Sequence, residues 1–133
     1  MRLFLPMPGV TFHAPNGINS TKHLMILMAG PDGDKQVAVT SVTTDRNTRA
    51  TDNSCILLPT DHRFIKHRSY VSYVHATFMT VDAISRGLDR GLLGLDSTLA
   101  PEVTSRVVQG ALASNQTPLD VQAFVQANGS SWL

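Results

Sequence analysis

Residues 57–76, with the sequence LLPTDHRFIKHRSYVSYVHA, concentrate side chains that can move protons. Three of the five histidines in the chain lie in this stretch. Histidine titrates near neutral pH, so His62 and His67 can serve in turn as general base and general acid. The carboxylate of Asp61 can orient one of the imidazoles. The stretch therefore indicates acid–base chemistry.

The same stretch carries positive charge. Arg68 or Arg63 can bind a phosphate through two parallel hydrogen bonds, and Lys66 adds phosphate affinity that is independent of sequence. Cleavage of RNA by transesterification needs a base for the 2′-hydroxyl, an acid for the leaving oxygen and positive charge near the phosphorane. All three kinds of side chain are present, so an RNA-cleaving site is one interpretation.

A predicted strand over residues 69–79 follows these cations. Alternation along the strand places Tyr73, His75 and Thr77 on one face. From that face Tyr73 and His75 can stack on unpaired bases, and His75 is a third candidate catalytic histidine.

A purely structural interpretation competes with the catalytic one. Histidines and arginines in a turn between strands are often only solvated, and sheet tyrosines such as Tyr70 and Tyr73 are often half-buried. Phe64 and Ile65 would then tuck inward and hold a surface loop in place.

Two further chemistries deserve comparison. His62, His67 and His75 could bind a metal with Asp61 as a fourth ligand, but their spacing matches no familiar site. Cys55 could be a nucleophile, but it lies in an apolar strand, where a thiol usually behaves as a small hydrophobe. We predict neither a metal nor another cofactor.

Composition limits the other possibilities. A chain of 133 residues with 42% hydrophobic content fits one domain, 1–133. A net charge of +1 excludes strong bulk attraction to nucleic acid, so polyanion binding needs a local patch. The single cysteine excludes an internal disulfide and fits a reducing compartment. Two prolines interrupt the short apolar N-terminus, which therefore matches neither a signal peptide nor a membrane span. We expect a cytoplasmic protein without membrane contact.

Strand signals dominate residues 9–80. The apolar run 23–30 ends at the turn residues PDGD, and the β-branched run 35–44 follows, which predicts a hairpin. Residues 45–53 have almost no apolar side chain and are expected to form a long exposed loop. The remaining predicted strands cover 9–14, 54–58 and 69–79.

Helical spacing begins after residue 80. Residues 80–91 predict a short helix that ends at a glycine, residues 92–95 a connecting or edge strand, and residues 99–113 a helix whose apolar stripe lies on the sheet. In the C-terminal segment 115–133, Thr117 as N-cap and Pro118 at the first helical position predict a last helix. The expected fold is mainly β with C-terminal helices.

The order of these elements resembles the PemK/MazF-like toxins. The resemblance rests on H-L-x-I-L, V-T-S-V-T-T, C-I-L-L-P, S-Y-V-S-Y-V-H-A and the run from L-L-G-L to V-V-Q-G-A-L, and covers roughly residues 9–114. It implies a small SH3-like antiparallel barrel over 9–80, completed by a helical half over 81–114, with a fold related to the CcdB gyrase poisons. It also implies a homodimeric, metal-independent endoribonuclease that cleaves single-stranded RNA and is held inactive by a cognate antitoxin of a type II toxin–antitoxin system.

The resemblance carries over two positions and departs at a third. Thr43 and Thr44 match a Thr-Ser pair beside the family's RNA groove. Arg46 and Arg49, in the following loop, are further candidate RNA contacts, although a plain polar loop also explains them. Where the family places a catalytic arginine, the best register puts Val74.

This departure keeps a second function class open. An SH3-like barrel can be a binding module without chemistry, as the CcdB-like relatives are. Residues 57–76 and 45–53 would then form a docking surface for a protein partner. Trp132, beyond the resemblance, would pack back on the body or into a partner subunit.

Overall fold

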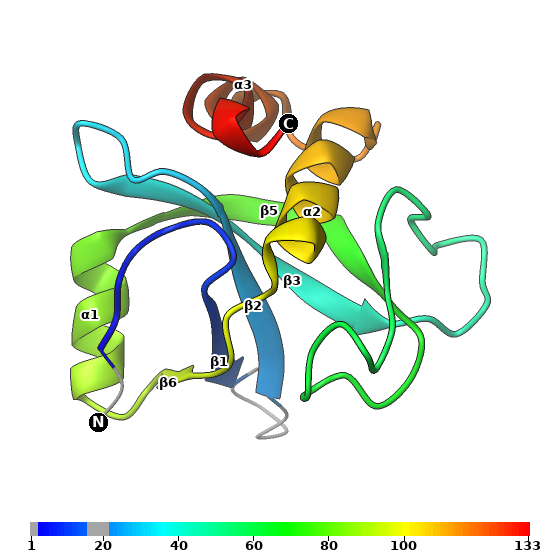
Figure 1. The fold of residues 1–133 in the computed structure, drawn as a ribbon, viewed down its shortest axis with the longest axis horizontal. Helices are drawn as coiled ribbons and strands as arrows, with labels where there is room; N and C mark the ends of the chain where they lie inside the picture. The colour runs from blue at the N-terminus through cyan, green and yellow to red at the C-terminus, as the bar shows by residue number, and fades with distance from the viewer. Residues whose placement is uncertain (1–2, 16–21) are drawn as a thin grey trace.

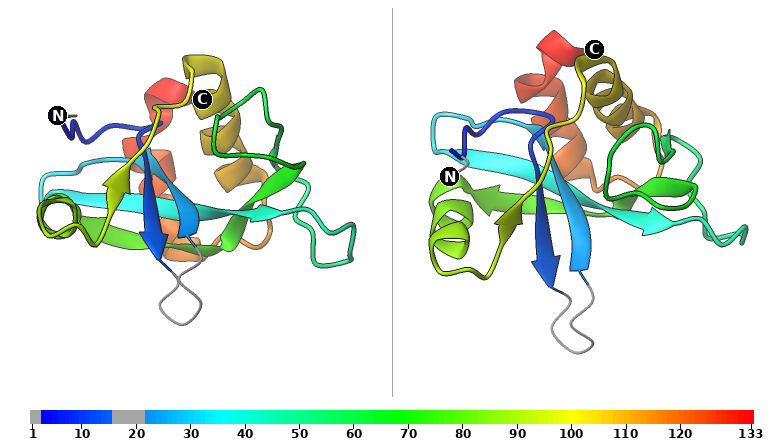
Figure 2. Two further views of the ribbon diagram at one scale, coloured as in Figure 1. Left: turned by 90° about the horizontal axis from the view of Figure 1, so that it is seen from below. Right: turned by 60° about the horizontal axis from the view of Figure 1, so that its bottom comes forward.

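The computed structural model describes residues 3–15 and 22–133. Within these residues, six strands form one antiparallel sheet in the order β4-β5-β3-β2-β1-β6 (Figure 1). The strands are β1 (Thr11–Pro15), β2 (Lys22–Ala29), β3 (Gln36–Thr44), β4 (Ile56–Leu57), β5 (Ser69–Thr80) and β6 (Gly94–Leu95). Figure 2 shows the β1–β2 pair crossing the β3–β5 pair steeply, so the sheet curls into a half-barrel. The protein is therefore a mixed α+β fold.

The predicted hairpin is confirmed as β2 and β3. In its turn, Oδ1 of Asp32 accepts hydrogen bonds from the amides of Asp34 and Gln36, at 3.0 and 2.9 Å. Gly30 enters the turn with a φ of +98°, and a Cβ there would lie 2.7 Å from the carbonyl oxygen of Gln36. The turn therefore requires glycine at this position.

Alternation along β2 divides the core into two clusters, one on each face of the sheet. Leu24, Ile26 and Met28 belong to the larger cluster, which packs beneath α2 (Pro101–Ala113) and α3 (Leu119–Asn128). Leu27 belongs to the smaller cluster on the opposite face, where α1 (Val81–Asp89) contributes Ile84. The helices thus lie on both faces of the sheet, with α2 and α3 on one face and α1 on the other (Figure 1).

The long strand β5 bulges where it pairs with β3. Val39 pairs with Thr77 and Ser41 with Ser72, so two steps along β3 correspond to five along β5. The extra residues break the alternation that the sequence predicted. His75 and Thr77 are exposed, but Tyr73 is fully buried. The prediction that Tyr73 shares an exposed face with His75 and Thr77 is therefore wrong.

Tyr73 is a core residue instead. Its hydroxyl donates a hydrogen bond of 2.6 Å to the carbonyl oxygen of Val107 in α2. A Cβ at Gly110 would overlap that hydroxyl, so the glycine makes room for the ring. Burial raises the pKa of Tyr73. No ring face is left for a base to stack on.

The helical half follows the prediction with small differences. Thr80 caps α1, whose Ala83 amide donates to the threonine hydroxyl at 3.0 Å. Residues 54–58 give only the two-residue strand β4. The last helix begins at Leu119 with Pro118 in the cap position, and Thr117 makes no capping bond. A 3₁₀ turn (Ser130–Trp132) ends the described chain, and Trp132 packs back against the larger cluster. No helix in the described part of the chain is long and apolar enough to cross a bilayer.

Candidate nucleic-acid interface

The loop between β4 and β5 carries most of the predicted chemistry, and His62 anchors it. The His62 side chain is 1% exposed. Its Nδ1 accepts from the Phe64 amide at 3.0 Å, so the proton of the neutral ring lies on Nε2. Nε2 donates to the carbonyl oxygen of Ser97 at 2.8 Å and lies 3.0 Å from the hydroxyl oxygen of Thr11. Both ring nitrogens are therefore occupied by structural contacts.

The environment of His62 favours its neutral form. Burial lowers the pKa of His62, while the hydrogen bond to Ser97 and the Asp96 carboxylate, 3.6 Å away, act in the opposite direction. A neutral imidazole with both nitrogens engaged cannot take a proton from a substrate without breaking the loop anchor. The predicted base–acid pair of His62 and His67 is not brought together: His67 is exposed and lines a pocket to which His62 does not contribute.

Asp96 is the carboxylate at this site. Its Oδ2 lies 2.5 Å from Nε2 of His13, and its Oδ1 accepts from Nε of Arg63 at 2.7 Å. The backbone amide of Ser97 donates to the same Oδ1 at 2.7 Å. Burial alone would raise the pKa of Asp96, but the hydrogen bonds from Arg63, Ser97 and His13 hold it well below its usual range.

Asp61, predicted to orient an imidazole, instead contacts the Leu58 amide and Arg106. Its Oδ2 accepts from the Leu58 amide at 2.8 Å, and its Oδ1 accepts from Arg106 of α2 at 2.9 Å. These contacts tie the β4–β5 loop to α2. Three consecutive residues thus fix the loop to two parts of the protein: Asp61 to a helix, and His62 and Arg63 to the segments around β1 and β6.

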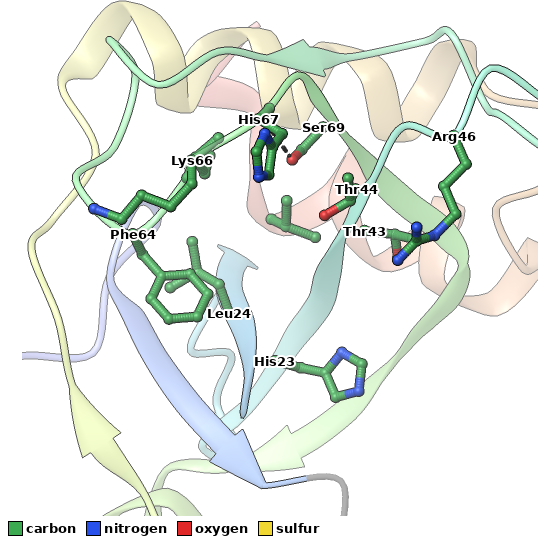
Figure 3. Close-up of a pocket in the computed structure, with 11 residues that line it drawn as sticks. His23, Leu24, Thr43, Thr44, Arg46, Phe64, Lys66, His67 and Ser69 are labelled. Carbon is green, nitrogen blue, oxygen red and sulfur yellow. Dashed lines mark hydrogen bonds between the residues drawn. The ribbon is translucent and has the colours of Figure 1, made fainter. Parts of the chain in front are cut away.

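A pocket of about 390 Å³ opens where β2 and β3 part. The pairing between these strands begins at Met25–Ser41, so the preceding residues of β2 and the following residues of β3 diverge. The β4–β5 loop closes the third side (Figure 3). The lining residues are His23, Leu24, Val42, Thr43, Thr44, Arg46, Phe64, Ile65, Lys66, His67 and Ser69.

The pocket has an apolar floor and a cationic rim. Leu24, Val42 and Ile65 form the apolar part. In Figure 3 the guanidinium of Arg46 folds back toward Thr43, and His67 and His23 stand at opposite ends. No aspartate or glutamate is among the lining residues that the structure describes. The local charge is therefore positive although the whole chain is nearly neutral.

A second pocket of about 360 Å³ adjoins the first and shares His23 and Thr43 with it. It is lined by Ala14, His23, Met25, Ser41, Thr43 and His75. Nδ1 of His75 lies 2.7 Å from the hydroxyl oxygen of the buried Ser72. The two pockets meet at His23 and Thr43, where β2 and β3 diverge, and we call the pair the His23 groove. Leu24 and Val42 of the first pocket belong to the face of the larger core cluster and Met25 of the second to the face of the smaller one, so the pockets open on opposite faces of the sheet. His67 lines the first pocket and His75 the second.

The other predicted cations lie outside this groove. Arg63 pairs with Asp96, and Arg68 pairs with Asp45 at 3.1 Å, which joins the start of β5 to the end of β3. Arg49 is exposed on the loop after β3. Lys66 lines the groove, but its Nζ donates to the Arg63 carbonyl at 2.9 Å and points away from the pocket (Figure 3). Of the predicted RNA contacts, the groove therefore gathers Thr43, Thr44 and Arg46, with only the stem of Lys66 on its wall.

The described residues contain no group of three or more His, Cys, Asp and Glu side chains placed to hold a metal ion. The metal interpretation of His62, His67, His75 and Asp61 therefore has no geometry to support it. Burial raises the pKa of the Cys55 thiol to about 11, so the thiolate needed for nucleophilic attack is disfavoured.

Four residues of this region are not among the predicted site residues: His13, His23, Phe64 as a pocket wall, and Asp96. His13 and His23 are far in sequence from residues 57–76, and only the strand order brings them near. The signal for Asp96 was weak, since a lone carboxylate after a short strand is common. Comparison with protein-family models, with curated proteins and with solved structures finds no match for this chain.

Proposed function

We propose that this protein is a PemK/MazF-like toxin of a type II toxin–antitoxin system that cleaves single-stranded RNA in the His23 groove without a metal ion. The observation that carries the proposal is the groove itself: two adjoining pockets lined by Arg46 and three histidines, with no carboxylate among their described lining residues. Such a surface attracts a polyanion and supplies groups that transfer protons near neutral pH.

The proposed chemistry is transesterification. One imidazole takes the proton of the 2′-hydroxyl, the 2′-oxygen forms a bond to phosphorus, and the bond from phosphorus to the 5′-oxygen breaks. A second imidazole, in its protonated form, gives a proton to the 5′-oxygen. The products are a 2′,3′-cyclic phosphate and a 5′-hydroxyl. His67 and His23, at opposite ends of the first pocket, are the proposed pair, in place of His67 and His62.

Arg46 is the proposed stabiliser of the phosphorane. The resemblance puts Val74 where the family has its catalytic arginine, so this chain needs another source of guanidinium charge. Arg46 lines the groove beside Thr43 and Thr44, the two positions that match the family's RNA-contacting pair. Arginine stays charged at all relevant pH values and can hold two phosphate oxygens together.

The family assignment supplies the remaining proposals. The curled antiparallel sheet with helices on it is compatible with an SH3-like, PemK/MazF-like barrel. The family resemblance also leads us to propose that the protein is a homodimer. A cognate antitoxin would inhibit it by covering the groove, and an acidic segment would complement the groove's charge.

The test is cleavage of mixed-sequence single-stranded RNA in EDTA by the wild type and by His67→Ala, His23→Ala and His75→Ala. Loss of one general acid or base lowers the rate by about 10²- to 10⁴-fold. We expect such a loss for His67→Ala and His23→Ala in variants that retain the wild-type thermal midpoint. Wild-type protein that cuts no RNA, with or without divalent metal, would overturn the proposal.

One observation favours the non-catalytic alternative. Val74, at the position expected for the arginine, is 53% exposed on β5. An exposed valine there suits contact with a protein more than with RNA. If this CcdB-like alternative holds, Val74→Asp weakens binding to a protein target, while histidine substitutions change affinity but no rate.

A further inference from the structure

Phe64 is the aromatic side chain that lines the first pocket of the groove. Its ring is half-buried and stands at the edge of the pocket across from His23 (Figure 3). The neighbouring floor of Leu24, Val42 and Ile65 is apolar. A flat aromatic wall over an apolar floor is a surface for another flat, poorly hydrated group.

Contacts with β1 and with its own loop hold the Phe64 ring. The His13 ring lies against it with a centroid distance of 4.4 Å and an interplanar angle of 54°. His13 is in turn held by the Asp96 carboxylate. Just before the ring in sequence, Arg63 pairs with Asp96, and Nδ1 of His62 accepts a hydrogen bond from the Phe64 amide. The ring is therefore placed by its surroundings before any ligand arrives, which lowers the entropic cost of binding.

The polar side chains of the same pocket suit the sugar and phosphate of a nucleotide. Arg46 and His67 are cationic or can become so, and the hydroxyls of Thr43 and Thr44 can bond to a base edge or a sugar. The volume of about 390 Å³ falls within the range of small-ligand sites, about 300–1,000 Å³. Aromatic, apolar and cationic groups are thus arranged around one small cavity.

We propose that this pocket binds a single unpaired nucleobase of an RNA strand, stacked on Phe64, with the adjoining phosphate held by Arg46 and His67. The proposal rests on the proposed function for its substrate, and it adds where one base of that substrate binds. Phe64 is a binding residue in this account, and the His13–Asp96 pair positions it. Stacking is tolerant of base identity, so the hydroxyls of Thr43 and Thr44 set any preference.

The test is a thermodynamic cycle on binding, made with strands that cannot be cleaved. Wild type and Phe64→Leu are titrated with a fluorescein-labelled 2′-O-methyl hexanucleotide of mixed sequence and with an otherwise identical strand whose sugars lack bases. Both strands carry the same phosphates, so their difference reports the bases. We expect Phe64→Leu to weaken binding of the base-containing strand about tenfold and to leave the abasic strand unchanged. Equal weakening of both strands, or no weakening of either, would overturn the proposal.

Phe64→Trp keeps the test decisive if Phe64→Leu does not fold. Stacking of a base on the new indole quenches its fluorescence, and the wild type, with Trp132 on the far C-terminal turn, is the control. We expect quenching by the base-containing strand in Phe64→Trp alone. An unchanged spectrum, or failure of the wild type to bind either strand, contradicts the base pocket.

Failure of the proposed function gives a different result. If the base-containing strand alone is weakened by Phe64→Leu but the wild type cuts no unmodified RNA, the base pocket is supported and the nuclease proposal fails. If the wild type cuts RNA and Phe64→Leu leaves the KM unchanged, the nuclease is supported and the base-pocket proposal fails.

Discussion

Nε2 of His13 lies 2.5 Å from Oδ2 of Asp96, and this contact joins β1 to the segment that follows β6. The other oxygen of the same carboxylate accepts from Arg63 in the β4–β5 loop. Three segments distant in sequence therefore meet at one carboxylate. The position of the loop that carries Phe64 and His67, and with it the shape of the groove, depends on Asp96.

Asp96→Asn should destabilise the protein. The amide keeps the shape of the side chain but loses the charge that Arg63 and His13 hold, and hydrogen bonds to charged groups are worth about 2 kcal/mol. We expect the free energy of unfolding in urea to fall by about that amount. Asp89→Asn, an exposed carboxylate at the end of α1, is the matched control. An equal change in the free energy of unfolding for the two substitutions would show that the Asp96 contacts do not stabilise the fold.

The stability should fall as the pH falls from neutrality, and His62 should contribute to the slope. The pKa of His62 is lowered in the folded state, so the unfolded chain binds its proton first. The stabilising contribution of neutral His62 is full above its unfolded pKa, near 6.5, and is lost as the pH decreases below that value. Urea unfolding at a series of pH values from 7.5 to 5 gives the free energy of unfolding as a function of pH. The slope of this plot should be shallower for His62→Gln than for the wild type.

His67→Gln is the control for that slope, because it removes an exposed imidazole from the same loop. A slope that His62→Gln leaves unchanged, or makes steeper, would show that His62 is not held neutral. Asp96 adds a second fall in the free energy of unfolding at lower pH. Because its pKa is depressed in the folded state, Asp96 contributes stability above about pH 4, and this contribution is lost on further acidification.

Tyr73→Phe should affect stability and leave RNA binding unchanged. The substitution removes the hydrogen bond to the Val107 carbonyl inside the larger core, which costs about 1 kcal/mol. Tyr73 has no exposed surface. The two measurements are urea unfolding and binding of a 2′-O-methyl strand. Weaker RNA binding by a variant of unchanged stability would restore Tyr73 to the interface.

Arg46 and Arg49 should differ in their effect on RNA binding. Both follow β3, but only Arg46 lines the groove. Arg46→Gln should reduce affinity and flatten the plot of log K against log salt concentration by about 0.7, the value for one phosphate contact on a single strand. Arg49→Gln carries the same change in net charge and should alter the slope less. Equal slopes for the two variants would place the phosphate path outside the groove.

The sequence was sufficient to predict elements whose signals are local. Turn residues and β-branched runs located the β2–β3 hairpin, and helical spacing located α2. Alternation failed at Tyr73 because it assumes an unbroken pleat, and the β5 bulge depends on pairing with β3. The last helix begins one residue later than predicted because Pro118 takes the cap position.

The site was less predictable because its contacts cross long distances in sequence. His62 and His67 are five positions apart and look alike in a sequence, but one is buried between Thr11 and Ser97 and the other is exposed. His23 enters the groove only because β2 and β3 diverge after Met25–Ser41. Burial and strand divergence are tertiary properties, so residue type and spacing do not determine them.

The most direct test of RNA cleavage in the His23 groove is mass spectrometry of the products from two oligonucleotides of one mixed sequence. One oligonucleotide has free 2′-hydroxyls and the other has 2′-O-methyl groups, and each is incubated with purified wild type in EDTA. We predict fragments that end in a 2′,3′-cyclic phosphate and begin with a 5′-hydroxyl from the first strand, none from the second, and none from either with His67→Ala. Intact first strand, or cleavage of the 2′-O-methyl strand, would contradict the account.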